Sequence, residues 1–130
     1  MTLGIHHLGL TVENLEEAKD FFVTLLGWKL VKEDPSYPNA FVSDGNILIT
    51  LWKTQTDQPT AFNRKTNIGL HHLALRVADE NELNETYQKI AKSKYKIEFA
   101  PELLRQGPSK HFMVYGPSQI RIEFIHYLTK

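Results

Sequence analysis

The sequence predicts an α+β protein made of two like halves, each with the order strand, helix, strand, strand, strand. The chain has 130 residues, a length typical of one domain. Residues 5–12 recur as residues 70–77, an offset of 65 residues, with five of the eight positions identical. Each copy is followed by a helical pattern and then by three extended segments. Two tandem βαβββ modules account for this repeat better than chance.

The helix of each half is predicted from its first turn. Asn14 and Asp79 are good N-cap residues, and each is followed three residues later by a glutamate, Glu17 or Glu82, as in a capping box. Gly27 can end the first helix in the left-handed conformation. The apolar residues at helical spacing are Leu15, Ala18, Phe21, Phe22, Leu25 and Leu26 in the first half, and Leu83, Tyr87, Ile90 and Ala91 in the second.

Three extended segments follow each helix. They cover residues 28–32, 40–43 and 47–52 in the first half, and residues 96–99, 110–115 and 120–126 in the second. Turn sequences at residues 44–46 and 116–118 separate the last two strands of each half. We therefore expect a single domain that consists of module 1 (about residues 1–53), a polar linker (about 54–68) and module 2 (about 69–130).

Composition excludes several classes of function. The 15 Lys and Arg balance the 15 Asp and Glu, which argues against a nucleic-acid partner. Without cysteine there is no disulfide, thiol nucleophile or cysteine-based zinc site. The longest strongly apolar run, residues 47–52, is too short to cross a bilayer, and the first residues do not resemble a secretory signal. We expect a cytoplasmic protein with neither a nucleic-acid nor a membrane partner.

Strand alternation sorts the histidines between two faces. His7 and His72 are expected to face a cavity, while His6 and His71 point to the helix side and are structural. Glu123 is a carboxylate in the middle of a strand. It needs a partner, because a buried unpaired carboxylate is costly.

Two imidazoles and one carboxylate from three strands form a 2-His-1-carboxylate set. His7, His72 and Glu123 are therefore the candidate ligands of one divalent metal ion, Fe, Mn, Ni, Co or Zn, with coordination positions left open for substrate. In the alternative interpretation, His7 and His72 are ordinary strand histidines, and Glu123 bonds an arginine, Arg121 or Arg76.

Further candidates share the predicted cavity face. His111 and Tyr115 are candidate general acids or bases. Substrate-binding candidates are Thr50, Trp52, Arg76, Met113 and Arg121, of which Trp52 would form an aromatic wall and the arginines would bind a carboxylate.

These stretches resemble the vicinal-oxygen-chelate superfamily, which includes glyoxalase I, bleomycin-resistance proteins, extradiol dioxygenases and fosfomycin-resistance transferases. The resemblance rests on residues 5–16, 21–22, 26–28, 44–45, 70–77 and 116–123. It implies the glyoxalase/bleomycin-resistance/dioxygenase fold, in which a mixed sheet curls around a central cavity with a divalent metal, and it implies a homodimer. The superfamily's ligand positions map to His7, His72 and Glu123.

Departures from the family patterns leave the reaction open. Glyoxalase I has a fourth ligand where Thr50 or Ile49 stands, the dioxygenases have a tyrosine at the place of Met113, and the transferases have a threonine at Gly9. We expect a metal-dependent enzyme, lyase/isomerase-like or dioxygenase-like, that acts on a small oxygen-chelating substrate. The alternative is a metal-free protein that sequesters a drug or toxin, of the bleomycin-resistance type.

Overall fold

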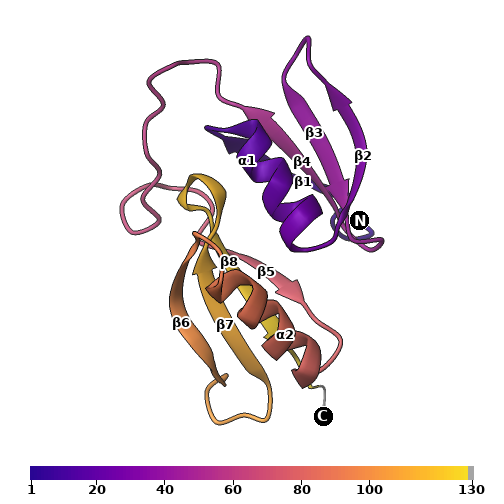
Figure 1. The fold of residues 1–130 in the computed structure, drawn as a ribbon, viewed down its shortest axis with the longest axis vertical. Helices are drawn as coiled ribbons and strands as arrows, with labels where there is room; N and C mark the ends of the chain where they lie inside the picture. Colours follow the sequence, from indigo (N-terminus) through magenta and orange to yellow (C-terminus); the bar gives the residue numbers. More distant parts are fainter. Residues whose placement is uncertain (129–130) are drawn as a thin grey trace. The chain divides into compact units, whose positions relative to one another are not determined.

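The computed structural model describes residues 1–128 and contains two four-stranded mixed sheets. The sheets belong to two compact units, Met1–Thr60 and a second unit that starts at Ala61, so the boundary lies inside the stretch predicted as a linker. Each unit is one βαβββ module, as Figure 1 shows by the labels along the chain. The predicted fold class is confirmed.

The first unit consists of six elements. They are β1 (His7–Val12), α1 (Leu15–Asp20), a π-helical segment η1 (Phe21–Leu25), β2 (Lys29–Asp34), β3 (Asn39–Ser43) and β4 (Leu48–Lys53). The sheet order is β1-β4-β3-β2, with β1 parallel to β4 and the other pairs antiparallel. The first strand of the unit is therefore hydrogen-bonded to the last.

The second unit repeats this topology. Its elements are β5 (Leu73–Arg76), α2 (Glu80–Ala91), β6 (Lys96–Leu103), β7 (Lys110–Tyr115), a 3-10 segment η2 (Pro117–Gln119) and β8 (Arg121–His126). The order β5-β8-β7-β6 again pairs the first strand in parallel with the last. The internal sequence repeat is thus a repeat of structure.

Both predicted helix starts are confirmed by side-chain caps. Asn14 Oδ1 accepts a hydrogen bond from Glu17 N at 3.0 Å, and Asp79 Oδ1 accepts one from Glu82 N at 2.8 Å. The first helix ends at Gly27, which has φ of +76°. Its last part departs from the expected α-helix, since Leu26 N bonds Phe21 O at 3.0 Å in a π-helical pattern.

One face of each sheet is covered by its helix. In Figure 1, α1 lies across the first sheet and α2 across the second, in contact with β6, β7 and β8. Each core is made by the covered face of a sheet together with the helix on it. The core residues are Leu10, Val12, Ala18, Phe21, Phe22, Ala40, Val42, Ile49 and Leu51 in the first unit, and Leu73, Leu75, Leu83, Ile90, Phe112, Val114, Ile122 and Phe124 in the second. The other face of each sheet is free to carry polar side chains.

Strand alternation decides which residues reach that open face. In β1, Leu10 and Val12 are buried while His7, Gly9 and Thr11 are exposed, as the sequence predicts. In β8, Ile122 and Phe124 belong to the core, so Arg121, Glu123 and Ile125 lie on the open face. Among residues 1–128, no helix is long and apolar enough to cross a membrane.

Candidate functional site

Glu123 is the centre of the polar side chains on the open face of the second sheet. It lies in the middle of β8, opposite Ala74 of β5 and Met113 of β7, and is only 8% exposed. Its carboxyl group meets two imidazoles: His111 Nδ1 lies 2.5 Å from Oε2, and His72 Nε2 lies 3.3 Å from Oε1. These two imidazoles are the partners that the buried carboxylate of Glu123 needs.

Neither arginine suggested as an alternative partner bonds this carboxylate. Arg121 donates two hydrogen bonds to Glu98, and Arg76 Nη2 donates to the carbonyl of Tyr127 at 3.3 Å. The interpretation of Glu123 as one half of an arginine pair is therefore wrong. Because side chains alternate along β8, Arg121 lies on the same face as Glu123. Its guanidinium group nevertheless bonds Glu98 on β6.

His111 lies between two carboxylates. Its Nδ1 bonds Glu123, while its Nε2 lies 3.8 Å from Glu102 Oε1 at the end of β6. The ring also meets Phe99 edge-on, with 5.0 Å between ring centroids. The ring is therefore held by its bond to Glu123 and its contact with Phe99.

A second polar cluster on this face consists of Arg64, Glu98, Tyr115 and Arg121. Glu98 accepts hydrogen bonds from Arg121 Nε at 2.8 Å and Nη2 at 2.7 Å, which is bidentate pairing. These bonds, together with one from Tyr115, lower the pKa of Glu98 to about 2. Arg64 Nη1 donates to the Tyr115 hydroxyl at 3.2 Å.

The sequence did not reveal two members of this cluster. Arg64 comes from the stretch predicted as a linker, where no local signal distinguishes it from any other surface arginine. Glu98 was detectable in principle, because it is a carboxylate inside a predicted strand, as Glu123 is. Two of the predicted substrate or acid/base candidates, Arg121 and Tyr115, are engaged in this cluster.

Thr50 occupies in the first unit the position that Glu123 has in the second. It lies opposite Gly9 and Phe41, just as Glu123 lies opposite Ala74 and Met113. Thr50 is 2% exposed, and its hydroxyl accepts a hydrogen bond from Trp52 Nε1 at 2.9 Å. The first module therefore has a hydroxyl where the second has a carboxylate.

Trp52 belongs to an aromatic cluster with Tyr37 and Phe41. Its ring centroid lies 5.5 Å from that of Tyr37 and 5.9 Å from that of Phe41, both edge-on. Lys32 Nζ lies 5.8 Å from the Phe41 centroid. The cluster presents aromatic surface near Thr50, and sequence analysis had named only its tryptophan.

The two histidine pairs have the same geometry in both units. His6 Nδ1 lies 3.0 Å from His7 Nδ1, and His71 Nδ1 lies 2.8 Å from His72 Nδ1. The prediction that the first histidine of each pair points to the helix side is wrong, since all four are exposed. The strands begin only at His7 and Leu73, so alternation does not extend to the residues before them.

The donor types fit a divalent metal, although the three proposed ligands belong to different units. His7 is in the first unit, and His72 and Glu123 approach each other in the second. Neutral imidazole nitrogen and a buried carboxylate oxygen are the donors that Fe, Mn, Ni, Co and Zn accept. Within residues 1–128 no three His, Asp or Glu side chains are gathered into a preformed metal-holding group.

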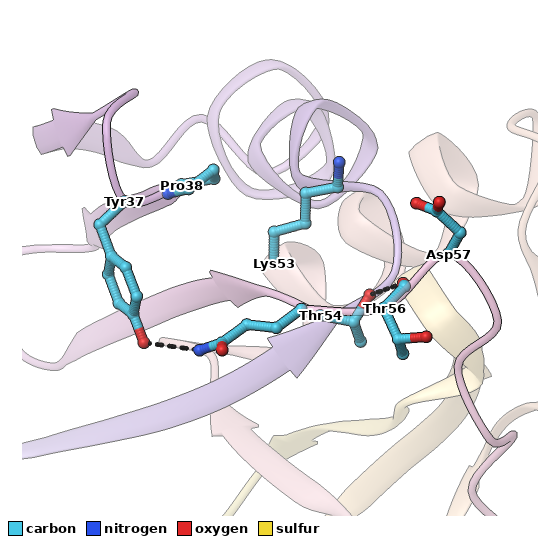
Figure 2. Close-up of a pocket in the computed structure, with 7 residues that line it drawn as sticks. Tyr37, Pro38, Lys53, Thr54, Thr56 and Asp57 are labelled. Atoms are coloured by element: carbon cyan, nitrogen blue, oxygen red, sulfur yellow. Dashed lines mark hydrogen bonds between the residues drawn. The ribbon is translucent and has the colours of Figure 1, made fainter.

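A separate pocket of about 390 Å³ lies in the first unit, where β4 ends and the β2–β3 turn approaches it (Figure 2). Two of its lining residues are bonded to each other, since Gln55 Nε2 donates a hydrogen bond to the Tyr37 hydroxyl at 2.9 Å. Its lining residues are Tyr37, Pro38, Lys53, Thr54, Gln55, Thr56 and Asp57. None of the predicted site residues lines it.

Solved structures share this fold. A glyoxalase/bleomycin resistance protein/dioxygenase domain from Frankia sp. EAN1pec is 22% identical, with a TM-score of 0.85 and coverage of 98% of this chain and 100% of the other. A lactoylglutathione lyase from Agrobacterium tumefaciens is 18% identical, with a TM-score of 0.74 and coverage of 96% and 94%. A glyoxalase family protein from Enterococcus faecalis is 19% identical, with a TM-score of 0.74 and coverage of 95% and 98%.

No curated protein sequence matches the chain. A family match covers nearly all of it, from residue 4 to residue 124. It includes both histidine pairs, Thr50 and Glu123, and therefore both modules. The chain belongs to the Glyoxalase/Bleomycin resistance protein/Dioxygenase superfamily.

Proposed function

We propose that the protein is a small metal-dependent enzyme whose divalent ion is held by His7, His72 and Glu123. The observation that carries this proposal is the approach of two of these residues: Glu123, which is only 8% exposed, has Oε1 3.3 Å from His72 Nε2. The chain belongs to a superfamily that includes lyases, and this supports the proposal that it is an enzyme.

The substrate of this enzyme would be a small molecule with two neighbouring oxygens, and the reaction would be lyase/isomerase-like or dioxygenase-like. When bound, an ion of Fe, Mn, Ni, Co or Zn supplies Lewis acidity for negative charge on those oxygens. His111, held by Glu123 on one side, can move a proton at Nε2. The aromatic cluster around Trp52 can bind an apolar or planar part of the substrate, and the exposed Arg76 can bind a carboxylate.

Metal analysis of protein purified without a histidine tag tests the ligand set. We expect about one equivalent of metal in the wild type and clear losses in His7→Gln, His72→Gln and Glu123→Gln. His126→Gln and Glu85→Gln, which change the same residue types elsewhere, are the matched controls and should retain the metal. Full metal content in the His72 and Glu123 variants would remove these residues from the site.

A metal-free binding protein is the second candidate, and the aromatic cluster favours it. Tyr37, Phe41 and Trp52 offer a surface suited to an aromatic drug or toxin. In the presence of a chelator, such a ligand should raise the unfolding temperature of the wild type but not of Trp52→Ala. If instead stabilisation by every tested aromatic ligand requires metal, this candidate fails.

We further propose that the protein acts as a homodimer in the cytoplasm, and the basis for the homodimer is the family resemblance alone. Sedimentation velocity at micromolar concentration should give a mass near 30 kDa, about twice the 15.0 kDa of one chain. A mass of one chain across the concentration range would contradict it.

A further inference from the structure

We infer that the first histidine of each pair, His6 or His71, is a positioning residue that sets the tautomer and orientation of the imidazole after it. This inference rests on the proposed function, because it gives these two residues a role toward the proposed ligands. It begins from one geometry that occurs twice: the two Nδ1 atoms of a pair lie 3.0 Å apart in the first unit and 2.8 Å apart in the second.

These distances are hydrogen-bond distances, and they constrain where protons reside. A neutral imidazole has one protonated and one unprotonated nitrogen. A hydrogen bond between two Nδ1 atoms therefore requires that one ring is protonated at Nδ1 and the other is not. The two rings of a pair must hold opposite tautomers, so the state of the first histidine determines that of the second.

This constraint matters for metal ligation at Nε2. In the second pair, His72 uses Nδ1 to face His71 and Nε2 to face Glu123 at 3.3 Å. A histidine that binds a metal through Nε2 carries its proton on Nδ1 and donates it to an acceptor, which fixes the ring. With a metal ion on His72 Nε2, His71 Nδ1 would be that acceptor, and His6 Nδ1 would be the equivalent acceptor for His7.

The contact recurs in both copies of the internal repeat. The pairs stand 65 residues apart, in different modules and on exposed chain segments just before or at the start of a strand. The rings also have similar relative orientation, with centroids 5.2 and 5.0 Å apart and interplanar angles of 86° and 73°. The same dipeptide before equivalent strands therefore places the two rings in the same contact in both modules.

Nitrogen-15 NMR of the imidazoles tests the inference on the whole chain. In the metal-free protein, one Nδ1 of each pair should be protonated and the other not. With one equivalent of Zn²⁺, His7 and His72 should be protonated at Nδ1, and His6 and His71 at Nε2. Spectra in which neither Nδ1 of a pair carries a proton would overturn the inference.

Zinc affinity, measured by chelator competition, gives a second readout. His71→Phe removes the acceptor and should weaken Zn²⁺ binding by roughly 10- to 100-fold, the usual cost of losing an outer-shell partner. His71→Asn keeps an acceptor oxygen near the Nδ1 position and should stay within a few-fold of the wild type. His126→Phe is the control for the loss of an imidazole elsewhere and should bind like the wild type.

The outcomes separate this inference from the proposed function. If His71→Phe and the wild type have equal zinc affinity, the inference is wrong. If His72→Gln loses zinc in the same experiment, the proposed ligand set still holds. A wild type that takes up none of Fe, Mn, Ni, Co and Zn would overturn the proposed function, and the metal-free spectra would then decide the tautomer inference alone.

Discussion

At the scale of single residues, Thr50 and Glu123 show how one position differs between two modules of the same topology. Both side chains are nearly inaccessible to water, and both lie between equivalent neighbouring strands. Glu123 has two imidazoles within 3.3 Å, whereas the Thr50 hydroxyl is bonded by Trp52 Nε1. The chemistry around each position is therefore matched to the residue that stands there.

We predict that a carboxylate is poorly tolerated at the first of these positions. Thr50→Glu should lower the free energy of unfolding at pH 7 by about 3–5 kcal/mol, the cost of an uncompensated buried charge. Urea denaturation measures this. Thr50→Ser keeps the hydroxyl and should change stability by about 1 kcal/mol, so equal losses in the two variants would show that burial of charge is not the cause.

Glu98 should make stability depend on pH in the acid range. Its pKa falls from 4.5 to about 2 in the folded protein, chiefly because Arg121 bonds it with two donors. A lowered folded pKa means that the ionised group stabilises the fold above pH 4.5, and that this contribution is lost as the pH falls toward 2. We expect a loss of about 2 kcal/mol, less than the full shift implies because the pair is partly solvated.

The matched variant is Glu98→Gln, which keeps the size of the side chain but cannot ionise. Its free energy of unfolding, measured in urea at several pH values between 2 and 6, should be lower than that of the wild type at pH 6. The difference should shrink toward pH 2. Parallel curves for the two proteins over this range would contradict the role given to the Glu98–Arg121 pair.

At the scale of elements, the side-chain caps explain where both helices begin. Asp79 caps α2 through a 2.8 Å bond from Glu82 N, and the exposed cap has no other function assigned to it. Asp79→Ala should destabilise the protein by about 1 kcal/mol, while Asp79→Asn, an equally good cap, should cost much less. Thermal unfolding followed by circular dichroism would reveal a contradiction if both variants lost the same amount.

The elements also show where local patterns stop being informative. Capping residues and apolar spacing were sufficient for both helices, because these signals act within four or five residues. They did not reveal the π-helical turn at Phe21–Leu25, which brings both Phe21 and Phe22 into the core. Nor did they reveal that β6 continues to Leu103, since register with β7 is made by a distant segment.

At the scale of the whole molecule, a bound metal should stabilise the folded chain. A ligand that binds only the native state adds about 2.7 kcal/mol at a hundredfold excess over its dissociation constant. We predict that at least one of Mn²⁺, Fe²⁺, Co²⁺, Ni²⁺ and Zn²⁺ raises the unfolding temperature of the wild type by several degrees. Glu123→Gln should lose that increase, and an increase of the same size in both proteins would mean that the ion binds elsewhere.

The sequence alone determined that there are two βαβββ modules, where their helices start and which strand residues avoid the core. These properties follow from capping and alternation, which are patterns of neighbouring residues, and from an internal repeat that the sequence itself shows. Only the tertiary structure decided that Glu123 meets His111 and His72, that Arg64 joins Glu98 and Tyr115, and that each first histidine bonds its neighbour's Nδ1. Such contacts depend on the register between strands and on the exact residue at which a strand begins. Neither can be predicted from the residues of one strand, because both depend on pairing with segments that are distant in the sequence.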